Sequence, residues 1–195
     1  RVIAFFDGQN LFHSAQRVFG YGFPNFDPDA LAKKLCSNEG WQLLETHFYT
    51  GVPTSSSDPW WNQFWANKLN AMRRKGLKIF KRDLRVRQQT MRCSDGSDVT
   101  ANIFVEKGID VRIALDIVRL AYESRFDIAL IFSQDQDFTE VVREIQQIAQ
   151  NQKRWIKVVS AFPADSNTTD ARGINGSEWI KIDKASYDSC IDPVD

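Results

Sequence analysis

The run VIAFFDGQN at residues 2–10 sets the architecture. Its first five residues are apolar, which is typical of a strand buried on both faces of a parallel sheet. Asp7-Gly8 ends the apolar run, and apolar residues then recur at helical spacing to about Val18. A buried strand that leads directly into a helix is the start of a β-α-β unit, so the sequence predicts an α/β protein.

The same alternation of strand and helix patterns continues along the chain. Further strands are predicted at residues 43–49, 77–80, 128–132 and 156–161, with a short edge strand at 179–182. Helices are predicted after Asp27-Pro28 and Asp58-Pro59, over 109–122 with Val111, Ala114, Leu115 and Val118 facing inward, and over 139–149. This order implies right-handed crossovers, and it predicts a three-layer α/β/α sandwich around a mainly parallel sheet of about five strands.

Two segments lie outside this alternation. Residues 84–104 contain the alternating Arg85-Val86-Arg87 and the turn pair Asp95-Gly96, so we expect a projecting hairpin there. Residues 184–195 are expected to form a polar C-terminal tail. The prediction is therefore a single domain over residues 1–183, followed by that tail.

The composition excludes several classes of protein. The chain has 25 basic and 25 acidic residues, so its overall charge points neither to nucleic acid nor to a membrane. No apolar run approaches the roughly 20 residues needed to span a bilayer. Its cysteines, Cys36, Cys93 and Cys190, are far apart, which argues against a disulfide framework or a zinc site. We therefore expect a reducing, cytoplasmic location without membrane attachment.

Acidic residues follow two of the predicted strands. The strand at 2–6 ends at Asp7, and the strand at 128–132 runs into Ser133-Gln134-Asp135-Gln136-Asp137. Ligands of parallel sheets bind beyond the carboxyl ends of the strands, where the strand order reverses. If these two strands are neighbours, Asp7 and Asp135 face each other across that crevice. The first turn of the helix at 109–122 would bring Asp110 to the same edge.

Carboxylates that converge in this way favour a metal ion. They repel one another unless a cation or a proton intervenes, and all-oxygen ligation suits Mg²⁺ or Mn²⁺. Each acid also has a common structural explanation, because Asp7 or Asp135 could cap a helix and Asp110 could complement a helix dipole. The metal-site prediction therefore depends on the acids as a set.

Three short blocks resemble the signature of a known family. They are FDGQN at residues 6–10, EKGIDV at 106–111 and SQDQDF at 133–138. In this order they resemble NYN domains, in the LabA-like branch of the PIN-like nuclease superfamily, and the resemblance spans residues 2 to about 162. The family usually has Gly where this chain has Gln134, a difference that lies between two ligand candidates.

The resemblance implies a PIN-like, Rossmannoid sandwich with metal ligands at Asp7, Asp110, Asp135 and Asp137. It also implies that Asn10 orients a ligand or a water and that Ser133 supports the site from behind. The implied activity is phosphodiester hydrolysis by metal-activated water, most often of RNA. The alternative is an RNA- or DNA-binding regulatory module with the same fold and little turnover. The oligomeric state stays open, with a homodimer among the options.

Two neighbours of these acids have competing interpretations. Asp116 lies about 240° further round the helix than Asp110, so both cannot easily reach one ion, and pairing with a nearby Arg is at least as good an explanation. Lys107 could contact a scissile phosphate, or it could only pair with Asp110 or Glu106. We keep both residues as candidates near the site.

Cations are concentrated between Lys68 and Arg92, where Asp83 is the single acid. Neutralisation of phosphates by Lys and Arg is the main source of nucleic-acid affinity, so this segment predicts an anionic partner. The predicted contacts are Arg73, Arg74, Lys75, Lys81, Arg82, Arg85 and Arg87. The alternative is a solvated helix face followed by an edge strand that charges protect. Trp60 and Tyr49 could stack on bases, although packing in the core is the commoner use of such residues.

Overall fold

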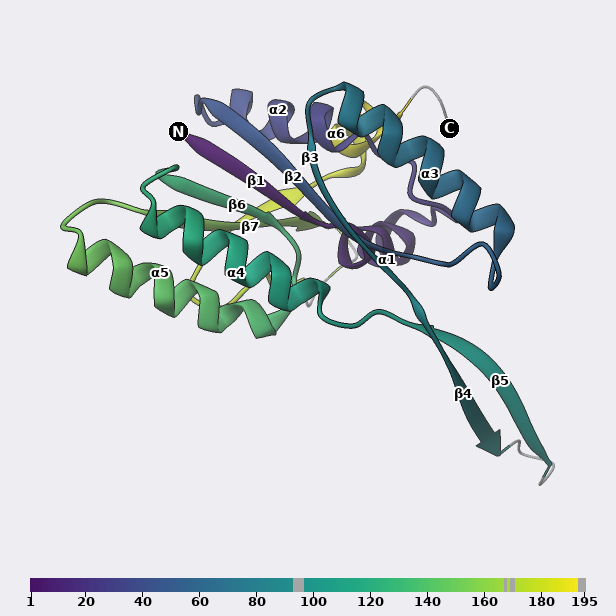
Figure 1. The fold of residues 1–195 in the computed structure, drawn as a ribbon. Helices are drawn as coiled ribbons and strands as arrows, with labels where there is room; N and C mark the ends of the chain where they lie inside the picture. Colours follow the sequence, from purple (N-terminus) through teal and green to yellow (C-terminus); the bar gives the residue numbers. More distant parts are fainter. Residues whose placement is uncertain (93–96, 167, 169–170, 193–195) are drawn as a thin grey trace.

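The computed structural model describes residues 1–92, 97–166, 168 and 171–192 (Figure 1). Its centre is a six-stranded parallel sheet with the strand order β3-β2-β1-β6-β7-β8. The strands are β1 (Val2–Asp7), β2 (Leu43–Val52), β3 (Lys78–Asp83), β6 (Ile128–Phe132), β7 (Lys157–Pro163) and β8 (Glu178–Ile182). The predicted parallel α/β architecture is confirmed, and the short edge strand is present as β8.

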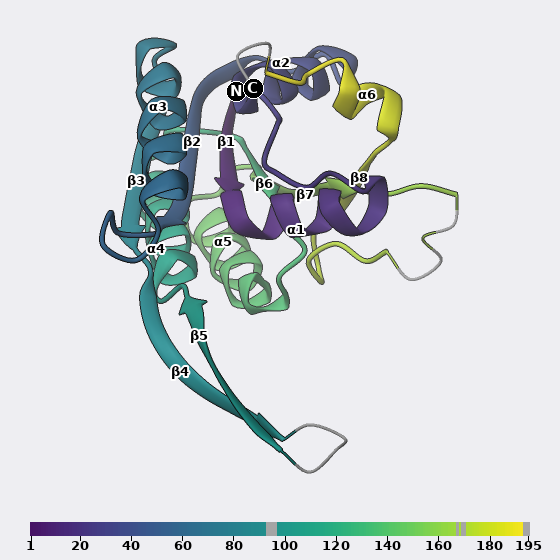
Figure 2. The ribbon, with the colours of Figure 1, turned by 90° about the vertical axis from the view of Figure 1, so that its right-hand side faces the viewer.

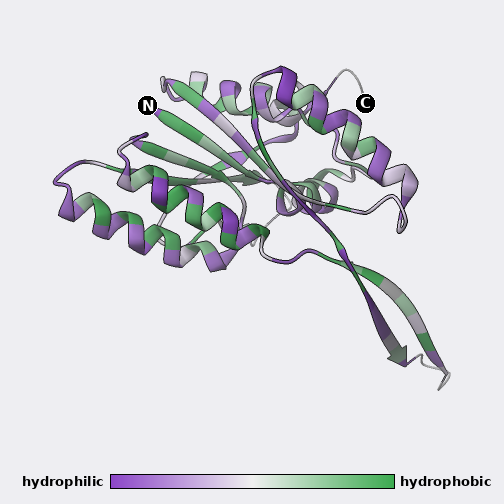
Figure 3. Ribbon diagram, viewed as in Figure 1, coloured by the Kyte–Doolittle hydropathy of each residue, from purple (hydrophilic) through white to green (hydrophobic). Residues whose placement is uncertain are grey.

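Helices cover both faces of the sheet (Figures 1 and 2). One face carries α1 (Gly8–Phe19), α2 (Pro28–Asn38), α3 (Pro59–Arg74) and α6 (Lys184–Asp188), and the other carries α4 (Ile109–Tyr122) and α5 (Thr139–Asn151). Residues of β1 alternate between the two cores: Ala4 and Phe6 pack toward α1 and α2, and Ile3 and Phe5 toward α4 and α5. Figure 3 shows this as apolar central strands between helices with hydrophilic outer surfaces. In the described part of the chain, no helix is long and apolar enough to cross a bilayer.

The inward face of α4 differs from the predicted one. Ile109, Ile113 and Ile117 are fully buried, whereas Val111 and Leu115 are 62% and 61% exposed. Apolar residues occur almost all round this helix, so hydrophobic spacing allowed two faces. The face that packs is the one with isoleucines at every fourth position, which is close to the helical repeat. The prediction for Val111 and Leu115 was therefore wrong.

A two-stranded antiparallel ribbon projects from the body of the molecule (Figures 1 and 2). It is formed by β4 (Arg85–Arg92) and β5 (Asp98–Val105), in a register that pairs Arg85 with Val105 and Arg92 with Asp98. Every residue of β4 is exposed. The turn expected at Asp95-Gly96 lies outside the described residues.

The C-terminal segment is folded onto the domain, in contrast to the expected polar tail. Tyr187 in α6 is fully buried, and its hydroxyl donates to Asn25 Oδ1 at 3.0 Å. The Asp27 N–H donates to the Cys190 carbonyl, and the Asp192 N–H donates to the Asn25 carbonyl, both at 2.8 Å. An aromatic side chain three positions before a buried cysteine gave this segment enough apolar surface to pack, so residues 184–192 belong to the domain.

Candidate metal centre

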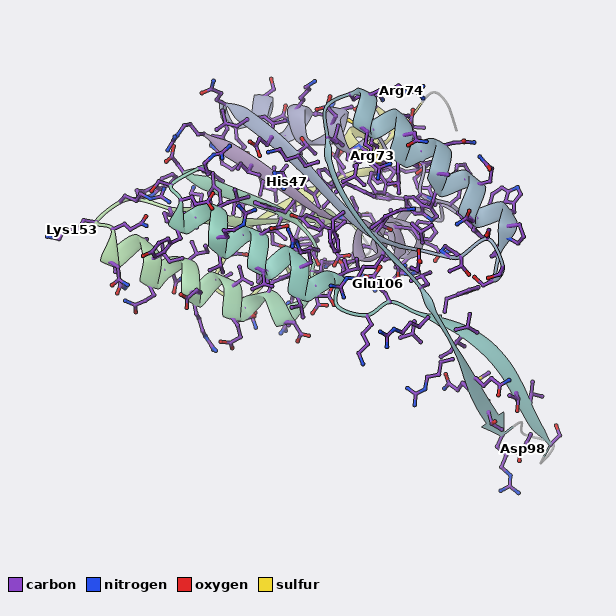
Figure 4. All side chains as sticks on the ribbon, in the orientation of Figure 1. His47, Arg73, Arg74, Asp98, Glu106 and Lys153 are labelled. Carbon is purple, nitrogen blue, oxygen red and sulfur yellow. The ribbon has the colours of Figure 1, made fainter. Side chains whose placement is uncertain are left out.

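Three carboxylates converge beyond the carboxyl end of β1. They belong to Asp7 at the end of that strand, Glu106 between β5 and α4, and Asp110 in the first turn of α4. One carboxylate oxygen of each lies within 4.8 Å of the others. Figure 4 shows Glu106 where the ribbon joins the body of the molecule. Among the described residues, this is the one group of three or more acidic, Cys or His side chains close enough to share an ion.

Asp7 is held by both the strand and the helix that meet at it. It is 2% exposed, and it caps α1 by accepting a hydrogen bond from the Asn10 N–H at 3.1 Å. Its other oxygen accepts from the Ser133 hydroxyl at 3.2 Å. Burial, with the charges of Asp110 and Asp135, raises the pKa of Asp7 to about 7 against these hydrogen bonds. The cap is therefore real, but it stabilises the charged form too little to offset burial.

Glu106 is the member of the cluster that the sequence had not singled out. Its carboxylate accepts a hydrogen bond from the Gly51 N–H of β2 at 2.6 Å. Burial and the neighbouring charge of Asp7 raise its pKa to about 7. The available signal is its position at the start of the EKGIDV block, four residues before Asp110.

Asp110 enters the cluster through the start of α4. Gly108 is the N-cap residue of this helix, with a left-handed φ of 78°, so the helix begins sharply and Asp110 falls in its first turn. A carboxylate is favoured there by the helix dipole. Burial, Asp135 and Asp137 nevertheless raise its pKa. The charges that act most on the cluster are thus those of other carboxylates.

Asp135 and Asp137 lie at the rim of the cluster. Strand β6 pairs with β1 as expected, so the loop after it reaches the same edge of the sheet. The Asp135 carboxylate accepts from the Asp137 N–H at 2.9 Å and so caps the 3₁₀ turn at Gln136–Phe138. The two acids act electrostatically on Asp110, but neither belongs to the group within 4.8 Å.

Ser133 and Asn10 connect the elements that carry the acids. The Ser133 hydroxyl donates to Asp7 and accepts from the Asp135 N–H at 3.1 Å. The Asn10 side-chain oxygen accepts from the Gln134 N–H at 3.0 Å, which ties α1 to the loop after β6. The Ser133 hydroxyl therefore links Asp7 to the loop that carries Asp135, and the Asn10 side-chain oxygen holds the same loop against α1.

Residues 1–172 match the NYN domain family. The chain belongs to this family. Among solved structures, a protein of unknown function from Vibrio parahaemolyticus is similar, with a TM-score of 0.52 and 16% identity over 95% of this chain and 94% of that chain. A ribokinase from Giardia lamblia has a TM-score of 0.36 and 11% identity over 64% of this chain and 36% of that chain. No curated protein matches the sequence.

Asp116 and Tyr49 have structural roles in this NYN domain. Asp116 accepts from Arg112 Nε at 2.9 Å, from Arg119 at 3.2 Å and from the Tyr49 hydroxyl at 3.0 Å. Asp116 is therefore paired with two arginines, which is the structural interpretation of this residue. Tyr49 is 1% exposed and packs in the core, the commoner of its two interpretations, whereas Trp60 is 64% exposed.

The basic residues of the NYN domain fall into two groups. Arg73, Arg74 and Lys75 lie at the C-terminal end of α3, which leads into the start of β3. They are therefore at the amino-terminal ends of the parallel strands, whereas the acids lie at the carboxyl ends; Figure 4 labels Arg73, Arg74 and Glu106. Lys75 is already paired with Asp27 at 2.7 Å. The second group, at the base of the ribbon, consists of Lys81, Arg82, Arg85 and Arg87, all exposed.

Arg82 connects this second group to the acidic block. Its guanidinium donates to the Lys107 carbonyl at 3.3 Å. The Lys107 side chain itself is exposed. Arg82 therefore links the base of the ribbon to the segment that carries Glu106 and Asp110, whereas the cations of α3 lie at the other end of the strands.

Proposed function

We propose that this NYN domain is a divalent-metal-dependent nuclease that hydrolyses phosphodiester bonds, with RNA as its principal substrate. The observation that carries the proposal is the convergence of Asp7, Glu106 and Asp110 within 4.8 Å. The NYN family belongs to the PIN-like nuclease superfamily, which supports the reaction class. The finer LabA-like assignment and a cytoplasmic location stay predictions.

The cluster fits a divalent cation. It offers only carboxylate oxygens, the ligands that Mg²⁺ and Mn²⁺ prefer. Burial raises the pKa of both Asp7 and Glu106 to about 7, and the charges of neighbouring carboxylates add to this effect. A bound cation would remove this repulsion, which is the expected signature of a site that is built for a positive charge.

Each acid has a place in the proposed reaction. Asp7, Glu106 and Asp110 hold Mg²⁺ or Mn²⁺, and Asp135 and Asp137 strengthen that hold from the rim. The bound ion would supply an activated water and stabilise the charge that develops on the phosphoryl oxygens. Ser133 is a positioning residue, because it donates to Asp7 and accepts from the Asp135 N–H. Asn10 positions the loop that carries Asp135.

The path of the nucleic acid is proposed to cross the base of the ribbon. Lys81, Arg82, Arg85 and Arg87 are exposed there, and Arg82 contacts the backbone of the acidic block. Such cations contribute to affinity by neutralising phosphates. Arg73, Arg74 and Lys75 lie where α3 leads into the start of β3, away from the acids at the carboxyl ends of the strands, so the proposed path does not include them.

A cleavage assay tests the proposal. Labelled single-stranded RNA and DNA are incubated with the protein in Mn²⁺, Mg²⁺ or EDTA, together with Asp110→Asn and the control Asp29→Asn. Asp29 is matched because it also lies in the first turn of a helix, α2, away from the cluster. We expect cleavage by the wild type and Asp29→Asn with metal, and none in EDTA or by Asp110→Asn.

A second candidate is a nucleic-acid-binding module with little turnover. The position of Asp135 favours it, because this carboxylate caps a turn and stays outside the group of three. Tight, salt-sensitive binding of RNA without cleavage in any metal would establish this candidate and overturn the nuclease.

A further inference from the structure

A polar pocket of about 470 Å³ lies beside the acidic cluster. It is bounded by α1, by the loop after β6 and by the segment before β8. Its charged and amide side chains are His13, Arg17, Gln134, Gln136, Arg172 and Asn175. Asn10 also lines it, and the N–H of this residue donates to Asp7. The pocket and the cluster therefore share a wall.

Two glutamines build the outer wall of this pocket. The Gln134 side chain donates to the Arg172 carbonyl at 2.9 Å, and the Gln136 side chain donates to the Gly173 carbonyl at 3.0 Å. The Asn175 N–H donates back to the Gln136 side-chain oxygen at 3.2 Å. Because Gln134 and Gln136 flank Asp135, the same loop positions an acid and anchors the segment that carries Arg172.

The lining of the pocket is cationic. Its described lining residues include two guanidinium groups and an imidazole but no carboxylate, in a chain with equal numbers of acidic and basic residues. Arg17 donates to the Ser14 hydroxyl at 3.1 Å and to the Gln134 side-chain oxygen at 3.4 Å, both neutral acceptors. Across the described part of the chain, neither Arg17 nor Arg172 forms an ion pair with a carboxylate. Two such groups over one pocket are suited to an anion, and guanidinium matches the geometry of phosphate.

We propose that this pocket is a nucleotide subsite, which binds a phosphate of the substrate strand next to the phosphodiester at the acidic cluster. The inference rests on the proposed function, because it assumes that the ligand is a nucleic-acid strand. Arg17 and Arg172 contact the phosphate, and the side chains of Gln136 and Asn175 contact the attached nucleotide. The volume is within the usual range for a site that encloses one small ligand, about 300–1,000 Å³.

Binding in EDTA separates this proposal from catalysis. The probe is a fluorescent single-stranded RNA octamer, and its affinity is measured by anisotropy at several salt concentrations. The variants are Arg17→Gln, Arg172→Gln and the double substitution, with Arg143→Gln as the control. Arg143 is exposed on α5 and is paired with Glu140, outside the pocket. Thermal melting checks that each variant is folded.

We expect each pocket substitution to weaken binding by about tenfold, which corresponds to a hydrogen bond to a charged group. The slope of log affinity against log salt concentration should also become shallower in the double variant, by the amount expected for the loss of about one or two phosphate contacts. Wild-type affinity in the double variant overturns the subsite but leaves the nuclease intact. Failure of the wild type to bind RNA or DNA in EDTA also overturns the subsite, whereas the nuclease is decided separately by the cleavage assay with metal.

A competition arm distinguishes a strand phosphate from a free nucleotide. Adenosine monophosphate and inorganic phosphate are added to the bound octamer. Displacement only at concentrations far above that of the octamer supports the strand subsite. Displacement by adenosine monophosphate at concentrations comparable to the octamer would show a site for a free nucleotide and overturn the proposal.

Discussion

The Gly51 N–H donates to the carboxylate of Glu106 at 2.6 Å, so strand β2 holds an acid that lies 55 residues further along the chain. The absence of a side chain at Gly51 makes this approach possible. A Cβ there would lie 2.6 Å from Glu106 Oε2 and would also collide with the side chain of Leu84. The third acid of the cluster is therefore positioned by the backbone of a strand that carries no acid at this edge.

The substitution Gly51→Ala should disturb this arrangement. We expect it to displace Glu106, to weaken Mn²⁺ binding, and to destabilise the fold by about 1–3 kcal/mol because the new methyl group is overpacked. Gly22→Ala is the control, since nothing lies within 4 Å of a Cβ at Gly22. Calorimetric titration with Mn²⁺ and thermal melting provide the comparison. Equal Mn²⁺ affinity in the two variants would show that Glu106 does not depend on Gly51.

Without metal, the protein should lose stability as the pH rises. The pKa of Asp7 is about 7 in the folded protein against an ordinary value of 3.8, so the folded chain holds more protons than the unfolded chain between these values. Glu106 acts in the same direction, from 4.5 to about 7. The free energy of unfolding should therefore be highest below pH 4 as far as these two groups are concerned. It should decrease as the pH rises from there to about 7 and both carboxyls ionise in the folded protein. His47, with its lowered pKa, acts in the opposite direction.

The variant Asp7→Asn isolates the contribution of Asp7 from that of His47. Asn can still accept from the Asn10 N–H, so the cap of α1 is kept. We expect its Tm in EDTA to exceed that of the wild type by roughly 5–10 °C at pH 8, and by much less at pH 4. Addition of Mn²⁺ at pH 8 should raise the Tm of the wild type but not that of the variant. If the wild type has the higher Tm at pH 8 in EDTA, the ionised Asp7 carboxylate does not destabilise the fold and its pKa is not raised.

Asp116→Asn should affect stability and leave metal binding intact. Asp116 accepts from Arg112, Arg119 and Tyr49, and it contributes no oxygen to the cluster. Loss of its charge should destabilise the fold by about 1–3 kcal/mol, as expected for a disrupted buried hydrogen-bond network. The Tm and the Mn²⁺ affinity are measured together. A large loss of Mn²⁺ affinity in a folded Asp116→Asn protein would restore this residue to the site.

The two groups of cations should differ in their contribution to RNA binding. Replacement of Arg85 and Arg87 by Gln should weaken RNA binding. It should also make the slope of log affinity against log salt concentration shallower, by the amount expected for the loss of about one or two phosphate contacts. Replacement of Arg73 and Arg74 by Gln is the matched control at the opposite edge of the sheet. Anisotropy titrations at several salt concentrations measure both. The reverse result, with the α3 variant more affected, would place the RNA on the other side of the molecule.

The parts of the site that could be predicted are those encoded locally. Asp7 and Asp135 follow buried strands, so their meeting depended only on β1 and β6 being neighbours, which they are. Asp135 nevertheless stays at the rim, because its carboxylate is used to cap the next turn. Sequence spacing shows which acids reach one edge of a sheet, but it does not show which of them also satisfy a nearby N–H.

The parts that could not be predicted depend on contacts between distant segments. Glu106 joins the cluster through Gly51, and no local pattern links these two positions. The cations near Arg73 and Arg85 form one run in the sequence, but β3 crosses the molecule between them and separates the two groups. Similarly, α4 offers two apolar faces, and only packing against the sheet selects the one with Ile113.

Mn²⁺ binding followed by electron paramagnetic resonance tests the central claim most directly. Wild type, Asp7→Asn, Glu106→Gln and the control Glu140→Gln are titrated at pH 8, with and without a nuclease-resistant RNA analogue. Glu140 is an exposed acid in the first turn of α5. The proposed centre predicts saturable binding by the wild type and the control, and loss of that binding in both cluster variants. Equal Mn²⁺ binding by all four proteins, or no binding by the wild type even with RNA, would contradict it.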